Sequence, residues 1–179
     1  MWPLTMNNTN LDSKSNFSSI AKFMHWGFVL LFIYGLLKQH YDDLNQLEDN
    51  ALLQFEVIFA TVFVLLLLIR FIYMKTTQKS SLPDSTPRSQ LLAARVVHYG
   101  MYACLALIPL TGLLIGLLFW LGFKDGFFIN AVVAAHEFSV SVIYWLIGLH
   151  ILAAIFRRFK SDGVWSSMVP FLKEKSHDK

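Results

Sequence analysis

The segment IFATVFVLLLLI, at residues 58–69, contains twelve consecutive residues without a charge, a proline or a glycine. It lies within a longer apolar run, and a helix needs about 20 such residues to cross a bilayer core about 30 Å thick. Backbone groups must be paired in hydrocarbon, and the sequence lacks the short alternating segments of membrane strands, so the run predicts a helix. This run and three others of similar length predict four spans, at about residues 20–40, 51–74, 91–123 and 129–159. The predicted fold is an all-α integral membrane four-helix bundle that forms a single domain over residues 1–179.

The composition agrees with lipid as the solvent of this fold. Hydrophobic residues make up 55% of the chain and charged residues only 15%, whereas soluble domains average about a quarter charged residues. The net charge of +3 is small and gives no indication of nucleic-acid binding. The single cysteine, Cys104, excludes an internal disulfide and a cysteine-only metal site, and its apolar surroundings predict a packed thiol. The polar first sixteen residues do not resemble a secretory signal.

The basic residues predict the orientation of the spans, because positive charge is retained on the cytoplasmic side. Thirteen of the fifteen Lys and Arg residues fall before the first span, around the connection between the second and third, or at and after the end of the fourth. The other side has only Lys38 and Lys124, together with five acidic residues. Both termini are therefore expected in the cytoplasm, including the tail at residues 160–179.

The connections carry the residues expected of loops. Pro83 and Pro87 lie in a polar inner loop at residues 80–89, and Gly122 and Gly126 predict a tight outer turn. Apolar residues between 164 and 171 could lie along the inner membrane surface as an amphipathic segment.

Ionisable side chains inside a membrane are costly, so each histidine in a span is a candidate functional residue. Five of the six histidines lie within or at the edges of the predicted spans, and His177 falls in the tail. The topology places three of the five in the cytoplasmic half, one in the outer half and one at the outer end of the first span. In that order they are His25, His98 and His150, then His136, then His40.

The last span presents two histidines on one face. His136 and His150 are 14 residues apart, close to four whole helical turns, which separates them by about 21 Å along the axis. Neutral imidazole is the usual axial ligand of haem iron, and helix bundles hold such cofactors in their cores. The competing interpretation is that each histidine simply hydrogen-bonds a neighbouring helix. Three nearby glycines would suit a flat macrocycle or ordinary helix packing equally well: Gly27, Gly35 and Gly148.

Short motifs, taken in order, resemble the bacterial cytochrome b561 family over about residues 18–170. They are His25-Trp26, Arg70 at the end of the second span, His98 followed by Pro109-Leu-Thr-Gly112, His136-Glu137 and Gly148-Leu-His150. Members are four-helix, quinone-linked membrane cytochromes related to the cytochrome b subunit of nickel–iron hydrogenases, and one branch acts as superoxide oxidase. The resemblance implies electron transfer through haem b in the bacterial inner membrane, within a respiratory chain and with ubiquinone as substrate.

The resemblance also implies roles for individual residues. His25 and His150 would hold the iron of the cytoplasmic-side haem b, and His136 would supply one ligand of a periplasmic-side haem. His98 would lie near the inner haem or a quinone site. Three inner cations could pair with haem propionates, although topology alone could explain them: Lys22, Arg70 and Arg157.

One departure from the family pattern concerns the outer haem. Its second histidine is expected 14 residues before Arg70, where this chain has Glu56, and Arg95 replaces a further histidine found in many members. His40 could substitute, Glu56 could ligate the iron, or the outer haem could be five-coordinate or absent. Glu56 itself is either a solvated or lysine-paired residue or a proton acceptor, and Glu137 invites the same two interpretations.

We therefore expect a membrane cytochrome with one or two b-type haems that carries electrons between a quinone pool and a redox partner protein or a small oxidant such as superoxide. The alternative is a redox-impaired membrane anchor or subunit of a larger complex, indicated by the missing histidine. A transporter is disfavoured, because no span shows the paired Gly/Pro interruptions of inverted repeats. Gly112 and Gly116 could pack the third span or mediate a homodimer.

Overall fold

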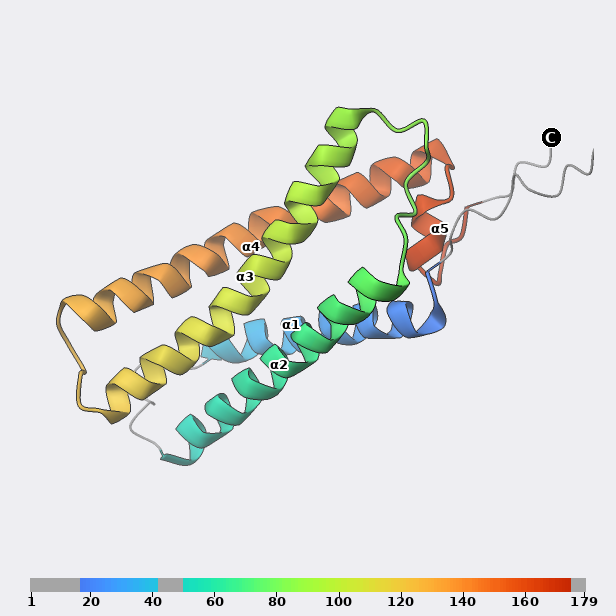
Figure 1. Cartoon of the computed structure of the whole chain (residues 1–179). Coiled ribbons are helices and arrows are strands. Elements are labelled where there is room, and N and C mark those ends of the chain that lie inside the picture. The colour runs from blue at the N-terminus through green and yellow to red at the C-terminus, as the bar shows by residue number, and fades with distance from the viewer. Residues whose placement is uncertain (1–16, 42–49, 175–179) are drawn as a thin grey trace, which may run out of the picture.

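The structure is a computed structural model that describes residues 17–41 and 50–174, with 39–41 and 50–52 described as backbone only. These residues form four long helices, a short fifth helix and no strand. The helices are α1 (Ser19–Tyr41), α2 (Asn50–Thr77), α3 (Arg88–Trp120), α4 (Phe127–Lys160) and α5 (Val164–Met168) (Figure 1). The four long helices are each long and apolar enough to cross a membrane. The prediction of an all-α, four-span membrane protein is confirmed.

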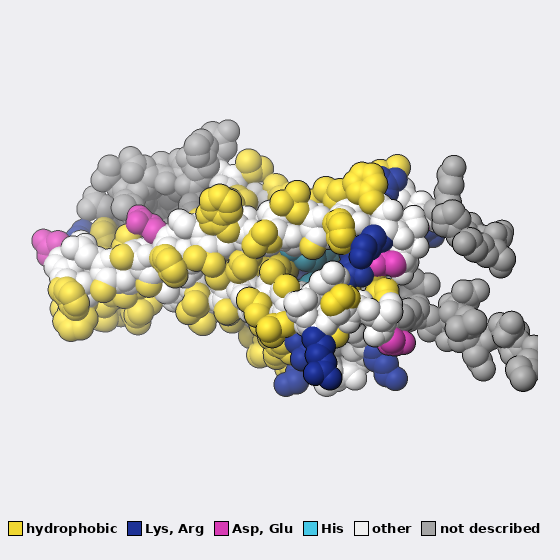
Figure 2. All heavy atoms as spheres, turned by 90° about the horizontal axis from the view of Figure 1, so that it is seen from above, with side chains coloured by type: hydrophobic (Ala, Val, Ile, Leu, Met, Phe, Trp, Pro, Cys, Tyr) yellow, Lys and Arg dark blue, Asp and Glu magenta, His cyan; other side chains and the backbone are white. Residues whose placement is uncertain are grey.

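Consecutive helices pack against each other, α1 on α2, α2 on α3 and α3 on α4, and α5 packs on α4. The start of α1, the α2–α3 connection and the end of α4 therefore lie together at one end of the bundle (Figure 1). We call this the basic end, comprising residues 17–25, 70–98 and 150–174. Figure 2 shows Lys and Arg side chains gathered there. We call the opposite end, with the α3–α4 connection, the distal end. The assignment of the basic end to the cytoplasm stays a prediction.

The interior of the bundle is small because lipid replaces water around it. Phe28, Phe63 and Leu67 form the buried cluster that joins α1 and α2, and Tyr102 of α3 packs against it. In the most apolar window of each span only 11% of the residues are buried. Leu and Phe side chains on the outside lose nothing in hydrocarbon, so the bundle does not have to bury them. Cys104 is buried, as predicted.

The third helix ends three residues earlier than predicted, at Trp120 rather than 123. The amide of Phe123 donates to the carbonyl of Leu118, and that of Gly122 to Phe119. This pair of bonds is a Schellman motif, which needs a left-handed residue, and Gly122 supplies it with φ +88°. Apolar residues continue past the turn, so hydrophobicity alone could not predict the end. At its start α3 extends to Arg88, because the polar first turn continues the helix beyond its apolar part.

We expect Gly122→Ala to lower the free energy of unfolding by about 1–2 kcal/mol, because a Cβ is strained in the left-handed region. Thermal unfolding of the purified protein in detergent measures the change. Gly35→Ala is the matched control, since Gly35 is helical and an added Cβ would meet the Phe59 ring at an ordinary 3.7 Å. Equal destabilisation by both substitutions would contradict the Schellman assignment.

Candidate functional site

Three histidine rings from three helices meet at the basic end: His25 of α1, His98 of α3 and His150 of α4. The centroids of the His25 and His150 rings are 6.3 Å apart, with 55° between the ring planes. The His98 and His150 rings are 5.1 Å apart and nearly perpendicular, at 89°. Figure 2 shows histidine between the hydrophobic surface and the Lys and Arg side chains of this end. The structure thus brings together the three histidines that the topology assigned to one depth.

The His25–His150 and His98–His150 separations fit different kinds of contact. Two imidazoles bound to opposite sides of one metal ion, each nitrogen about 2 Å from it, hold their ring centres roughly 6 Å apart. The separation of His25 from His150 matches this arrangement. The closer, perpendicular pair of His98 and His150 has the geometry of an edge-to-face ring contact. The spacing therefore favours His25 and His150 as the ligand pair.

Local contacts fix His25 at the start of α1. The Ser18 hydroxyl accepts a bond from the amide of Ala21 at 3.1 Å and so caps the helix. The same hydroxyl is 2.9 Å from the Tyr73 hydroxyl, and the Ser18 amide donates to Gln78. These bonds join the first turn of α1 to the end of α2. On the other side, the Trp26 indole donates to the carbonyl of Met168, so the tail after α4 also packs on this turn.

Arg70 of α2 is a partly buried cation beside His25. Its Nη2 atom lies 3.2 Å from Nδ1 of His25, and its guanidinium lies over the rings of Phe28 and Tyr102, at 5.3 and 5.6 Å. Its Nε atom is buried and has no hydrogen-bond partner, and no carboxylate of residues 17–41 or 50–174 pairs with it. Holding such a charge away from water is costly unless an anion pairs with it. The site therefore suits an anionic group.

Two glycines next to the candidate ligands open onto unfilled space. Gly27 lies two residues after His25, and Gly148 lies two residues before His150. A Cβ built at either position would meet no neighbouring heavy atom within 4 Å. Packing among the described residues therefore does not account for these two glycines. In addition, α1 and α4 are not among the closely packed helix pairs of the described residues.

His98 is held differently from the other two histidines. Its Nδ1–H donates to the carbonyl of Ala94 at 2.6 Å, so in the neutral ring the lone pair is on Nε2. The side chain is exposed at the surface of the bundle while one edge contacts His150. His98 is thus placed to meet a molecule that approaches from the lipid.

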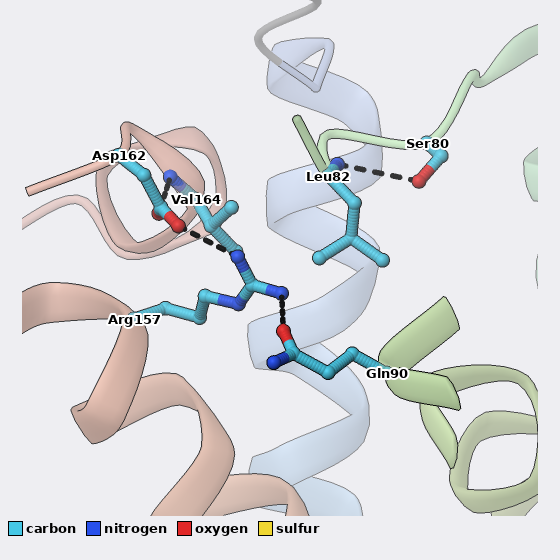
Figure 3. Close-up of polar contacts among 6 residues, drawn as sticks. All are labelled: Ser80, Leu82, Gln90, Arg157, Asp162 and Val164. Carbon is cyan, nitrogen blue, oxygen red and sulfur yellow. Dashed lines mark hydrogen bonds and ion pairs between the residues drawn. The ribbon is translucent and has the colours of Figure 1, made fainter. Parts of the chain in front are cut away.

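The other two predicted cations are placed less favourably than Arg70. Arg157 forms an ion pair with Asp162, at 2.8 Å, and donates to Gln90 Oε1 at 2.9 Å (Figure 3). Its charge is therefore already balanced within the chain. Lys22 is half-buried and lies one turn before His25 on α1.

The distal half does not bring together a second pair of imidazoles among the described side chains. His136 Nδ1 lies 2.9 Å from the hydroxyl of Thr111, and its ring lies against Gly112. Glu56 forms an ion pair with Lys38, so the lysine-paired interpretation of this carboxylate is confirmed. Glu137 is exposed. The side chain of His40 and all of His177 lie outside the described residues.

Sequence reasoning missed Thr111 as the partner of His136, and Phe28 and Tyr102 as the rings around Arg70. Thr111 lies inside the Pro109–Gly112 motif, so the sequence singled out the residue but did not indicate its contact with His136. Gly112 faces His136 and Gly116 faces Leu53 at 3.4 Å, so both glycines pack helices within this chain. A homodimer through them stays a prediction.

A family model for prokaryotic cytochrome b561 matches residues 16–171. The chain belongs to the prokaryotic cytochrome b561 family. It is therefore a multi-pass membrane protein that transfers electrons through b-type haem, and the predicted family is confirmed. No curated protein and no solved structure matches this cytochrome b561 chain.

Proposed function

We propose that His25 and His150 would hold the iron of a haem b at the basic end and that a membrane quinone is the substrate of this site. The proposal rests on the 6.3 Å separation of these two rings beside the partly buried guanidinium of Arg70, with which no described carboxylate pairs. When bound, the haem supplies one-electron redox chemistry. The residues of this chain hold it, neutralise it and exclude water from it.

Ligation requires a particular proton position on His25. A ring that binds iron through Nε2 carries its proton on Nδ1 and cannot then accept a bond there. In the structure Arg70 donates to this Nδ1 atom. The two demands conflict, so we propose that Arg70 turns from His25 to a haem propionate when the haem is in place. The orphaned Nε of Arg70 supports this role, because a carboxylate can accept from two guanidinium nitrogens at once.

The other cations have secondary roles in this proposal. Lys22 is close enough in sequence to His25 to contribute positive charge at the same level. Arg157 is the weaker candidate for a propionate because Asp162 already neutralises it. The propionates would then point toward the basic end, where the cations are.

The substrate side of the proposal rests on His98. A quinol that loses electrons must also lose two protons, and a neutral imidazole at the lipid surface can accept one of them. His98 is exposed and contacts the ligand candidate His150. Because its Nδ1–H donates to Ala94, the neutral ring has its lone pair on Nε2, which can accept a proton. We propose ubiquinone as the quinone, the inner membrane as the location and the cytoplasm as the side that the basic end faces. The second redox partner is a protein or a small oxidant such as superoxide.

The test is spectroscopic. Purified full-length protein from haem-replete cells should give a b-type reduced-minus-oxidised spectrum, and ubiquinol should reduce it under anaerobic conditions. Absence of b-type absorption would overturn the proposal.

A second candidate function is a membrane subunit that retains haem but does not react with quinol. It is favoured by the loss of the histidine at position 56. Haem that stays oxidised with ubiquinol, together with a co-purifying subunit that reduces it, would select this alternative.

We expect His98→Ala to retain the haem but to slow its reduction by ubiquinol by at least about 10-fold, because the proton acceptor is removed. Stopped-flow absorbance measures the rate. Tyr99→Ala is the matched control, since Tyr99 is the next residue and is 60% exposed. Identical rates for the two variants would remove His98 from the quinone reaction.

A further inference from the structure

We propose that this chain holds a single haem, and that a charge pair and a helix bridge occupy the region of the second. Electrons then enter and leave at the basic end, and the chain does not by itself conduct electrons across the bilayer. The inference rests on the proposed function, because it takes the basic-end haem as the sole redox centre.

The first observation is the ion pair between Lys38 of α1 and Glu56 of α2. Glu56 stands at the position of the expected second ligand, and its carboxylate is engaged by a lysine whose side chain is only 18% exposed. The Lys38 ammonium also lies 4.5 Å from the centre of the Phe55 ring. Using Glu56 as an iron ligand would require breaking its ion pair with Lys38, which costs free energy. The pair therefore disfavours ligation by Glu56.

The second observation concerns His136. Thr111 donates to a carbonyl of its own helix, that of Leu107 or Ile108, at 2.6 and 3.0 Å. Its oxygen is then the acceptor for the Nδ1–H of His136. The bond joins α4 to α3, and the ring lies against Gly112, where a built Cβ would come within 3.7 Å of Cε1. The bond gives His136 a role in joining two helices, and no second imidazole of the described side chains lies opposite its ring.

The third observation is a contrast between the two ends. At the basic end the separation of two imidazoles suits one metal ion, no carboxylate of the described residues pairs with Arg70, and an added Cβ at Gly27 or Gly148 would meet no neighbour. In the distal half Lys38 is paired with Glu56. The helical glycines there are each covered by a side chain: Gly35 by Phe59, Gly112 by His136 and Gly116 by Leu53. The paired imidazoles of the basic end thus have no counterpart among the described side chains of the distal half.

A single haem limits how the electrons of a quinol can leave the protein. Oxidation of one quinol to quinone releases two electrons and two protons. With one haem per chain, the two electrons must leave one at a time on the same side of the membrane, and each reduces a separate molecule of a one-electron acceptor. The partner of this protein is therefore a one-electron oxidant that reaches the basic end.

Haem stoichiometry tests the inference. We expect one haem per chain in the purified wild type and still one in His136→Asn, which keeps a donor for Thr111 but removes the imidazole. His136→Ala should also retain one haem while lowering the unfolding temperature, because the bridge between α3 and α4 is lost. Two haems in the wild type, or a loss of haem in His136→Asn, would overturn the inference and leave the basic-end site intact. No haem in the wild type would instead overturn the proposed function.

Sidedness gives an independent test. Membrane vesicles of both orientations are reduced with quinol, and ferricyanide, which does not cross the bilayer, is added outside. Rapid re-oxidation is expected only in vesicles that expose the basic end. Equal rates in both orientations would show a conducting path to the distal end and contradict the inference.

Discussion

Replacing either His150 or His25 with alanine is expected to lower the haem content of the purified protein at least about 10-fold. Each substitution leaves one imidazole where the proposed site uses two, and the haem is then held on one face only. The measurement is the haem-to-protein ratio from the pyridine haemochrome spectrum. Both variants should lose the same absorption, because both rings belong to one site in the proposal.

The matched control is His98→Ala, which removes a third imidazole from the same cluster. The His98 ring is nearer to His150 than the His25 ring is, at 5.1 against 6.3 Å. If the closer pair were the ligands, His98→Ala would lose the haem and His25→Ala would keep it. Imidazole added to the His150→Ala protein should restore the absorption, which distinguishes a lost ligand from a misfolded bundle.

The sequence predicted the four spans because a membrane helix has two simple requirements. It must be long enough to cross a bilayer core of fixed thickness, and its backbone N–H and C=O groups must be paired with each other. The four long apolar runs predict the fold class, and the charge pattern groups the connections that the structure places at one end. The apolar run predicted a span to about residue 123 and the glycines predicted a turn there; the structure ends α3 at Trp120, with Gly122 in the left-handed region.

The rotation of each helix could not be predicted in the same way. Residues that face lipid and residues that face the interior are both apolar in such a bundle, so hydrophobicity does not indicate which face packs inward. The contacts of His25 with Arg70 and of His136 with Thr111 join different helices and depend on that rotation. The depth of each histidine was predictable from topology, whereas its partner was not.

Glu56 stands where the family pattern has a histidine, and the sequence alone did not indicate its partner. The sequence showed that a histidine was missing, and it left several replacements open. The pairing with Lys38 selects among the interpretations of the carboxylate, because a lysine in the facing helix lies within ion-pair distance. The available signal was a lysine and a glutamate, Lys38 and Glu56, in the outer halves of adjacent apolar spans.

Arg70→Gln is expected to lower the midpoint potential of the haem by on the order of 50 mV, the size expected for one partly screened charge close to a one-electron centre. A cation near the haem stabilises the added electron, and Gln removes the charge while retaining a donor. The substitution should also weaken haem retention, because a charge-assisted bond contributes about 1.5–3 kcal/mol. Redox titration and the rate of haem transfer to apomyoglobin measure the two effects.

Arg157→Gln is the control that separates a local effect from a general change in positive charge. Both substitutions remove one guanidinium from the basic end, but Arg157 is already balanced by Asp162, whereas no carboxylate of the described chain faces Arg70. Arg70→Lys should recover most of the potential, because it restores the charge, and only part of the haem retention, because a lysine lacks the two-nitrogen fork. A larger shift from Arg157→Gln than from Arg70→Gln would reverse the assignment, and the propionates would then lie toward the end of α4.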